Sequence, residues 1–358
     1  MRFLVPLVAV LVLVLLAIAG AGAHFSQFLL GVVVPYAAIT IFVLGMIAKV
    51  VGWGKVPVPF RIPTTCGQQK SLPWIKQNKI ENPSGAGGAF IRMLLEVLVF
   101  RTLWRNLRTE KHGTPDNPQI VYKSTRWLWL GGMMFHWTFL LIVIRHLRFF
   151  FQRVPGFVQS LEHLDNGLKT VTTYAVVNNP GKLSMALHGF LQVGMPMLYV
   201  TDVLFITAVT YLLLRRIFIP QVKYMTLAND SFPLFLILGI GVSGVVMRYF
   251  HRVDVVGVKN LIMGLVSFHP AAPAGIGSVF YVHLLLVSTL FAYFPFSKLV
   301  HFGGVLLSPT RNLANNSREV RHINPWNYPV EVHTYEEYEN DFRAKMKMAG
   351  VPVEKEED

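Results

Sequence analysis

The amino-acid sequence predicts an all-α protein, a polytopic bundle of membrane-spanning helices. Its 358 residues are 53% hydrophobic and only 15% charged, a balance typical of chains that lie mostly within lipid. Long apolar runs without charges alternate with polar segments that hold most of the lysines and arginines. Several of these runs reach the length of about 20 residues that an α-helix needs to cross a bilayer. A soluble core does not have this pattern.

The charge balance predicts how the chain is oriented in the membrane. The chain has 33 Lys and Arg against 19 Asp and Glu, a formal charge of +14. In a membrane protein such an excess marks cytoplasmic loops, so we expect no nucleic-acid partner. The single cysteine, Cys66, excludes an internal disulfide. It also excludes an iron–sulfur cluster held by this chain alone, because such clusters normally need four thiolates.

Residues 1–23 form the first apolar segment. Arg2, the apolar run after it and a small-residue end (AGAGA) are also features of a cleavable signal peptide, so both interpretations stay open. We expect a retained transmembrane helix, because an even number of spans puts every strongly basic loop on one face of the membrane. Removal of this segment would leave five spans.

The membrane domain is expected over residues 29–309. With the first segment, its five spans make six, at residues 29–51, 126–150, 187–214, 232–250 and 277–305. A basic loop over residues 52–126 and a polar tail over residues 310–358 are expected in the cytoplasm, together with both termini. We therefore predict a multi-pass protein of the cell inner membrane.

One part of the basic loop has a helical pattern. Residues 88–107 combine a run of leucine, valine and phenylalanine with Arg92, Arg101 and Arg105, and they include Trp104. This pattern predicts an amphipathic helix that lies flat on the cytoplasmic surface or under a partner. A seventh span is the alternative, and the charges disfavour it.

Two histidines lie within the predicted span 126–150. His136 and His146 are ten residues apart, which on an α-helix is about 15 Å along the axis and a rotation of about 80°. An imidazole in the hydrocarbon region has no water to bond, so it normally faces the bundle interior and binds a partner there.

The span 277–305 carries a second set. His283 and His301 are eighteen residues apart, or five whole helical turns, so on a continuous helix they share one face about 27 Å apart. If the two helices are antiparallel, His146 meets His283 near the outer surface and His136 meets His301 near the inner one. A hydrogen bond between helices would explain one such histidine, but four at paired depths favour metal ligation.

The predicted cofactor is planar. Two separated sites with two histidines each suit a haem b with two axial positions, and they do not suit a tetrahedral zinc ion. The sequence therefore predicts two haems b, with their irons about 21 Å apart. Gly131 and Gly132 precede His136, and Gly303 and Gly304 follow His301, which we interpret as room for a macrocycle.

Five further side chains are candidate cofactor contacts. Arg145 and Arg148 either extend to the membrane surface or pair with haem propionates near the outer surface. His188 could compete as a ligand, and we expect it to hydrogen-bond near the outer haem. A quinol needs an apolar slot and a proton acceptor beside a haem. We place that slot near His146 and His283, with Arg145, Tyr281 and Lys169 as polar contacts.

These spacings resemble the gamma subunit of respiratory nitrate reductase, a dihaem cytochrome b with five spans, over residues 29–309. The resemblance implies the same pairing of His136 with His301 and of His146 with His283. In that family a small residue precedes the outer histidine, where this chain has Arg145, so the family's quinol pocket cannot be transferred directly.

Residues 61–83 and 308–327 resemble a second family over nearly the whole chain. It is the DsrM family, the cytochrome b subunits of the DsrMKJOP complexes associated with sulphite reduction. This resemblance implies menaquinone and menaquinol exchange in the membrane, and electron passage to a DsrK-like cytoplasmic iron–sulfur subunit, with the other DsrMKJOP subunits as further partners.

The residues themselves fit the same mechanism. Electrons from quinol would enter at the outer haem and leave at the inner one toward a cytoplasmic iron–sulfur partner. Two alternatives belong to other classes. A transporter would need broken helices around a central site, and Pro196, Pro233 and Pro295 do interrupt spans, but no internal repeat supports it. A membrane anchor without a redox role would leave the four histidines unexplained.

Overall fold

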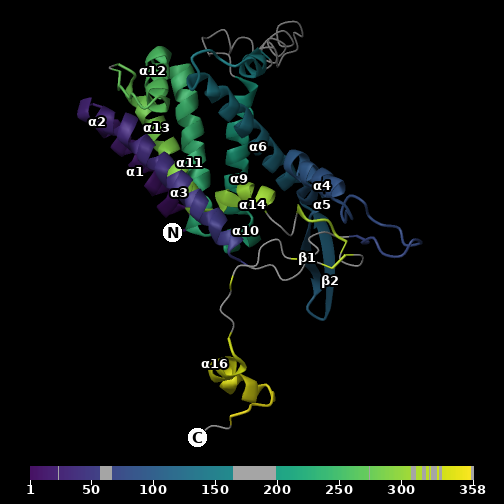
Figure 1. Cartoon of the computed structure of the whole chain (residues 1–358). Coiled ribbons are helices and arrows are strands. Elements are labelled where there is room, and N and C mark those ends of the chain that lie inside the picture. The colour runs from purple at the N-terminus through teal and green to yellow at the C-terminus, as the bar shows by residue number, and fades with distance from the viewer. Residues whose placement is uncertain are drawn as a thin grey trace.

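A computed structural model describes residues 1–22, 24–56, 67–163, 199–273, 275–307, 312–316, 320–321, 323, 329 and 333–355. The described chain is mostly helical, as the sequence predicts. The helices of the bundle lie side by side, with α2 (His24–Phe28) and α12 (Val255–Val266) at one end (Figure 1). Toward the other end lie the N-terminus and α10 (Pro220–Met225).

Four helical stretches among the described residues are long and apolar enough to cross a membrane. They are Phe25–Gly54, which contains the π-helical turn Leu29–Val33 and α3 (Val34–Gly54); Arg126–Phe149, which contains α6 (Arg126–His146); Ala228–Phe250, which contains α11 (Ala228–Val245); and Ser278–Phe296, which contains α13 (Ser278–Tyr293). These lie at four of the predicted spans. The total of six spans remains a prediction.

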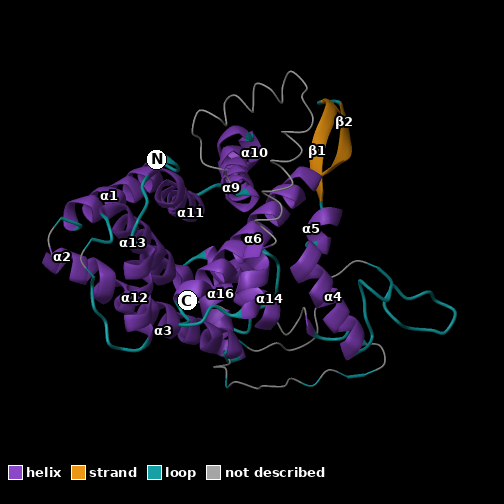
Figure 2. Cartoon of the chain, turned by 90° about the horizontal axis from the view of Figure 1, so that it is seen from above, coloured by secondary structure: helices purple, strands orange, loops and turns teal. Residues whose placement is uncertain are grey.

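Two further helices pack in the bundle. α1 (Leu4–Gly20) has 17 residues, and α9 (Val200–Phe218) covers the second half of the span predicted at residues 187–214. The first half of that span lies outside the described residues. α13 contacts α1, α3 and α11, while α9 joins α11 to α6, so the bundle is a chain of packed pairs (Figure 2).

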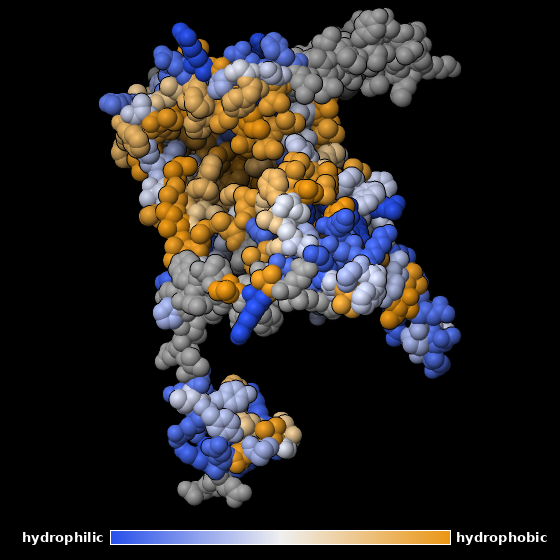
Figure 3. Space-filling model, turned by 45° about the vertical axis from the view of Figure 1, so that its right-hand side comes forward, coloured by the Kyte–Doolittle hydropathy of each residue, from blue (hydrophilic) through white to orange (hydrophobic). Residues whose placement is uncertain are grey.

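The interior and the exterior of the bundle are both apolar. Leu236, Leu261 and Leu286 are completely buried where α11, α12 and α13 meet. Large apolar side chains of α1 and α3, such as Leu16 and Leu44, remain exposed on the outside. Apolar side chains cover the helices in Figure 3, and hydrophilic ones gather at the ends and over the loop region. Lipid facing these exposed side chains replaces the water that a soluble protein would meet.

The second histidine helix is not continuous, and the prediction of one helix over residues 277–305 was wrong. α13 ends at Tyr293, short 3₁₀ turns follow at Phe294–Phe296 and Lys298–Val300, and α14 (His301–Leu307) starts anew. Pro295 has no backbone N–H to continue the helix. Ser297 between the turns is extended, and its hydroxyl accepts a hydrogen bond from the Leu299 N–H at 3.2 Å, which starts the next turn.

Close packing of α3 holds this break in place. The backbone of Gly45 approaches Pro295 so closely that a Cβ atom at Gly45 would lie 2.7 Å from the Pro295 Cβ. Such a contact is far inside van der Waals distance, so any larger residue would push the two segments apart. A glycine in α3 therefore allows α3 to pack directly against the break in the second histidine helix.

The predicted amphipathic helix is shorter than expected. α4 (Ala86–Val99) ends at Phe100, which has a left-handed backbone with φ 48°, and the short α5 (Arg101–Arg105) follows. The indole N–H groups of Trp129 and Trp137 on α6 donate hydrogen bonds to the carbonyls of Val99 and Leu98, at 2.7 and 3.0 Å. Side chains of α6 thus satisfy the carbonyls that a continued helix would have used.

An antiparallel hairpin was not predicted. Strands β1 (Leu107–Thr114) and β2 (Asn117–Ser124) pair beyond α5 and are exposed along most of their length. A hydrogen bond from Lys123 on the opposite strand lowers the pKa of Glu110 from 4.5 to about 2. This cross-strand link is therefore intact above pH 4.5 and is lost only as the pH falls through about 2.

The described tail ends in α16 (Tyr335–Met348), which lies apart from the bundle (Figure 1). Its first turn has a capping box, because the Thr334 hydroxyl accepts from the Glu337 N–H while the Glu337 carboxylate accepts from the Thr334 N–H. The buried Glu339 carboxylate also accepts backbone N–H groups of Glu354 and Lys355. This short segment is thus closed by its own hydrogen bonds.

Candidate functional site

The four intramembrane histidines meet in two pairs. His136 on α6 and His301 at the start of α14 have ring centroids 6.1 Å apart and nearly perpendicular ring planes, at 87°. His146, the last residue of α6, and His283 on α13 have ring centroids 6.3 Å apart and nearly parallel planes, at 11°. We call these the inner pair and the outer pair. The structure brings together the partners that the sequence predicts.

These separations suit a shared metal. A metal–nitrogen bond is about 2.0 Å and an imidazole ring nitrogen lies about 1.1 Å from its ring centre, so two imidazoles on opposite sides of one ion have centroids about 6.2 Å apart. The observed 6.1 and 6.3 Å agree with this value. A direct N–H···N hydrogen bond between two imidazoles, with the nitrogens about 2.9 Å apart, would instead bring the centroids to about 5 Å.

The outward-facing ring nitrogens are fixed by hydrogen bonds to the backbone. The Nδ1 atoms of His136, His146 and His301 lie 2.7, 2.7 and 2.9 Å from backbone carbonyl oxygens of Gly132, Ile142 and Lys298. Because a carbonyl only accepts, each Nδ1 must donate its proton. The Nε2 of each of these rings then carries the lone pair, which is the state that a metal ligand needs.

His283 reaches the same state through a side chain. Its Nδ1 lies 2.9 Å from the Ser243 hydroxyl oxygen on α11, and that hydroxyl lies 2.9 Å from the carbonyl of Ile240. The hydroxyl proton goes to the carbonyl, so the oxygen accepts the proton of His283 Nδ1. Sequence analysis missed Ser243, since a single serine in an apolar run carries no signal of its own.

The chemistry of the donor set restricts the cofactor. No group of three or more His, Cys, Asp or Glu side chains that could hold a metal occurs among the described residues. Each pair therefore offers two nitrogens and no third protein ligand. Two trans nitrogens fit an iron already held in a macrocycle, and a zinc site would need at least one more protein ligand.

Aromatic rings pack against His136 of the inner pair. Phe100 and Phe135 each approach the His136 ring edge-on, with centroids 4.9 Å away. Phe100 is the left-handed residue that ends α4, so the break in the amphipathic helix places this ring against the ligand. Aromatic walls keep water from the imidazole and orient it.

Of the glycines near the inner pair, Gly131 packs closely against a neighbouring helix, and room for a macrocycle beside the others stays a prediction. A Cβ on Gly131 would lie 2.6 Å from the Tyr211 ring of α9, so Gly131 allows close packing of α6 against α9. At Gly132 the nearest side-chain atom to an added Cβ would be Leu103 at 3.6 Å, and its carbonyl is the one that holds His136. Gly303 and Gly304 lie nearest Met46 and Trp53 of α3.

Arg145 is buried and belongs to a polar cluster beside the outer pair. Its guanidinium donates to the Thr201 hydroxyl at 3.2 Å and lies 4.8 Å from the centre of the Tyr199 ring. Arg248 approaches the same ring at 4.8 Å and forms an ion pair with Asp202 at 3.1 Å. The Asp202 carboxylate also accepts from the Tyr249 hydroxyl at 2.7 Å.

The sequence predicted only Arg145 of this group. Asp202 gives the one available signal, a lone carboxylate at the start of an apolar helix, where such a group needs a partner. Arg148 lies elsewhere, in an ion pair with Glu162 at 2.8 Å. Two arginines against one aspartate give the cluster a net positive charge close to the outer pair.

Tyr281, another predicted contact, does not face the outer pair. Tyr281 is fully buried, its ring packs near Gly31 and Leu261, and its hydroxyl has no hydrogen-bond partner among the described residues. Since two residues separate it from His283 on a helix, it faces another direction. Lys169 and His188 lie outside the described residues.

A polar cluster near the inner pair joins the loop after α3 to the segment after α14. We call it the loop cluster. Its members are Glu81, Asn82, Arg92, Arg101, Arg105 and Asn315. The Glu81 carboxylate forms ion pairs with Arg101 and Arg105, and the Arg92 guanidinium donates to the Glu81 carbonyl at 3.1 Å.

Asn315 anchors the tail in the loop cluster. Its backbone N–H donates to the Pro83 carbonyl at 2.7 Å, and its side-chain amide donates to the Asn82 side-chain carbonyl at 2.6 Å. Both asparagines are buried. These bonds join the loop after α3, α4 and the segment after α14 into one folded unit. The unit lies next to the inner pair.

Comparison with known proteins gives consistent relatives. Residues 182–321 match the family model described as nitrate reductase gamma subunit. The chain is 41% identical over 309 residues to an Hdr-like menaquinol oxidoreductase cytochrome b-like subunit of Archaeoglobus fulgidus, with 84% of each chain covered. It is 39% identical over 298 residues to the protein of the same description from Archaeoglobus profundus, with 82% of this chain and 81% of the relative covered.

A shorter match is to a nitrate reductase subunit. It is 31% identical over 102 residues to the respiratory nitrate reductase 1 gamma chain of Escherichia coli, which covers 26% of this chain and 45% of the relative.

Proposed function

This chain belongs to the family of Hdr-like menaquinol oxidoreductase cytochrome b-like subunits, and from that premise we propose that it is a membrane dihaem cytochrome b that carries electrons between menaquinol and a cytoplasmic iron–sulfur partner. The inner pair would hold one haem b and the outer pair the other. Menaquinone and menaquinol are the proposed exchanging substrates.

One observation carries this proposal. Both pairs have the centroid separation of trans imidazoles on one ion, and in both pairs every Nδ1 is engaged in a hydrogen bond that leaves Nε2 for a metal. A helix bundle without a cofactor has no need to orient four imidazoles in this way. A bound haem would supply a one-electron redox centre at each level.

The chain's own residues orient and insulate these sites. α6 fixes His136 and His146 on one rigid rod, about 15 Å apart along its axis. Phe100 and Phe135 shield the inner pair, and Ser243 holds the ring of His283. The positive cluster of Arg145 and Arg248 beside the outer pair suits carboxylate groups such as haem propionates.

We further propose that the chain acts as a DsrM-type subunit in sulphur metabolism. The DsrK-like iron–sulfur subunit of the same complex would dock at the loop cluster, with the other DsrMKJOP subunits as further partners. The basic loop supports a cytoplasmic position for this face and an inner-membrane location for the protein. The lone Cys66 supports a partner that provides the clusters.

Haem content tests the function directly. We expect the purified chain to contain two haems b per polypeptide, measured by pyridine extraction, and to show bis-histidine b-type bands in the difference spectrum of dithionite-reduced minus oxidised protein. Addition of menaquinol should produce the same bands without dithionite. A colourless protein after mild extraction would contradict the proposal. A single haem per polypeptide would contradict haem binding by one of the two histidine pairs.

Removal of the tail tests the docking surface. We expect a chain truncated after residue 307 to lose capture of the DsrK-like subunit in a pulldown, while its haem content stays unchanged, because Asn315 no longer organises the loop cluster. A chain truncated after residue 316 keeps that anchor and is the matched control, which should still capture the partner. Capture by the shorter chain would place the docking surface elsewhere.

A further inference from the structure

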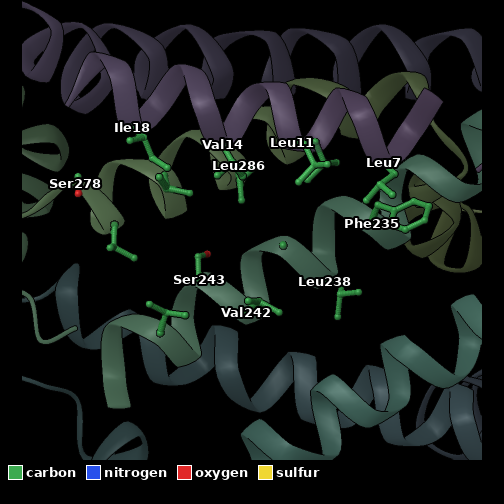
Figure 4. A pocket seen from close by; sticks show the side chains of 15 residues that line it. Leu7, Leu11, Val14, Ile18, Phe235, Leu238, Val242, Ser243, Ser278 and Leu286 are labelled. Atoms are coloured by element: carbon green, nitrogen blue, oxygen red, sulfur yellow. The ribbon is translucent and has the colours of Figure 1, made fainter. Parts of the chain in front are cut away.

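A narrow apolar slot of about 450 Å³ lies between α1, α11 and α13, behind the outer pair (Figure 4). Leu7 and Phe235 lie at one end of it, Ile18 and Ser278 at the other, and Ser243 lies between these ends (Figure 4). Its volume is in the range of ordinary ligand sites, and nearly all of its lining is apolar. α1 forms one whole wall.

Ser243 is the polar group that connects this slot to the outer pair. Its hydroxyl proton is donated to the carbonyl of Ile240, and one lone pair accepts the Nδ1 proton of His283. A hydroxyl oxygen has two lone pairs, so one acceptor position remains. A ligand in the slot can therefore bond Ser243 only by donating a hydrogen bond to it.

We propose that the slot between α1, α11 and α13 binds an isoprenoid quinol, with one quinol hydroxyl donating to Ser243 and the tail lying along α1 toward Leu7 and Phe235. This inference rests on the proposed function and gives its quinol site a location. It differs from the site predicted around Arg145, Tyr281 and Lys169. The apolar walls match an isoprenoid chain, and Ser278 marks the more polar end, where the ring would lie.

The one free acceptor position of Ser243 distinguishes quinol from quinone. A quinol carries O–H groups and can donate to Ser243, whereas a quinone carries carbonyls that only accept. Binding a quinone carbonyl would require Ser243 to give up its bond to Ile240. The site therefore prefers the reduced form by about one hydrogen bond, which is roughly five-fold in affinity, and it releases the oxidised form more readily.

The slot depends on α1. Leu7, Leu11, Val14 and Ile18 face α11 and α13 from one side of the helix. Leu16 does not line the slot, because it lies nine residues after Leu7 and so about 180° around the helix; its exposure, 59%, is close to the 51% of Leu11. The slot thus assigns a ligand-binding role to an N-terminal helix that otherwise only adds apolar surface to the bundle.

A pair of tryptophan substitutions tests the tail position. We expect Leu11→Trp to fill the slot and to weaken binding of menaquinol with an isoprenoid tail about ten-fold or more, the scale of steric overpacking. Binding of menadiol, which has the ring without a tail, should change by less than about two-fold. The matched control Leu16→Trp on the opposite face should leave both dissociation constants unchanged. Anaerobic equilibrium dialysis of the full haem-loaded chain measures them.

Substitution of Ser243 tests the ring position. We expect Ser243→Ala to weaken menadiol and tailed menaquinol equally, about five-fold, and to abolish the preference for quinol over quinone. Ser243→Thr keeps the hydroxyl and should restore that preference. Intact b-type bands after dithionite reduction show that the outer pair still holds its haem in each variant.

The outcomes separate this inference from the proposed function. Equal effects of Leu11→Trp and Leu16→Trp, with quinol binding retained, would overturn the slot and leave the proposed function standing. Loss of co-purifying phospholipid from Leu11→Trp with unchanged quinol binding would assign the slot to a lipid chain and also overturn it. Failure of the unmodified, haem-loaded chain to bind any quinol would instead contradict the proposed function.

Discussion

Replacing His136 or His301 by alanine is expected to halve the haem content and to abolish electron delivery to a cytoplasmic partner. Each variant removes one of the two imidazoles whose ring centroids lie 6.1 Å apart, and one imidazole without its partner would not hold the haem from both sides. Menaquinol should still reduce the remaining haem, because the outer pair is unchanged. Haem content, spectra and reduction of the DsrK-like subunit measure the three parts of this prediction.

The control for the inner pair is His112→Ala. His112 is exposed in the hairpin on the same side of the bundle as the loop cluster, where its ring bonds Glu110. This variant removes a histidine without touching either pair, so haem content and partner reduction should not change. Undiminished electron delivery in the His136 or His301 variants would contradict the assignment of the inner pair.

Replacing His146 or His283 by alanine is expected to abolish reduction by menaquinol while dithionite still reduces the haem of the inner pair. Ser243 lines the slot and bonds His283 of the outer pair. Loss of the outer pair would therefore remove the redox centre next to the bound quinol. Stopped-flow reduction by menaquinol, followed in the b-type bands, measures this effect. Changes around a metal ligand normally reduce activity about 10–100-fold. A reduction rate within about two-fold of that of the unmodified chain would therefore place quinol oxidation elsewhere.

His269→Ala is the matched control for the outer pair. His269 is exposed in a loop, and its Nδ1 bonds the carbonyl of Ser267, two residues earlier in the same loop. It therefore resembles the ligands in having a fixed ring, but no described histidine ring opposes it. Menaquinol should reduce this variant at the unmodified rate.

The pairing of histidines was predictable from the sequence, although part of the reasoning was wrong. The ten-residue spacing correctly placed His136 and His146 at two levels of one helix, because α6 runs without a break from Arg126 to His146. The eighteen-residue spacing was interpreted as five turns of one helix, yet Pro295 and Ser297 interrupt that helix. His301 still reaches His136, since the break moves α14 without removing it from the inner end.

The supporting residues around the pairs were not predictable. Ser243 bonds His283 across 40 positions of sequence, and Phe100 reaches His136 only because two indoles of α6 end α4. Gly131 was interpreted as space for a macrocycle, whereas it allows Tyr211 to approach. Such contacts depend on which helices become neighbours, and periodicity within one helix holds no information about that.

The sequence by itself determined that this chain is a helical membrane protein with histidines at two depths. Apolar runs of bilayer length and the histidines within them are local properties, because hydrocarbon tolerates only helices and rarely tolerates an unpaired polar group. Tertiary structure alone decided that Ser243 bonds the ring of His283, that Phe100 lies against His136, and that a slot lies behind His283. Each of these arises where side chains from different helices meet, so it exists only after the helices have packed.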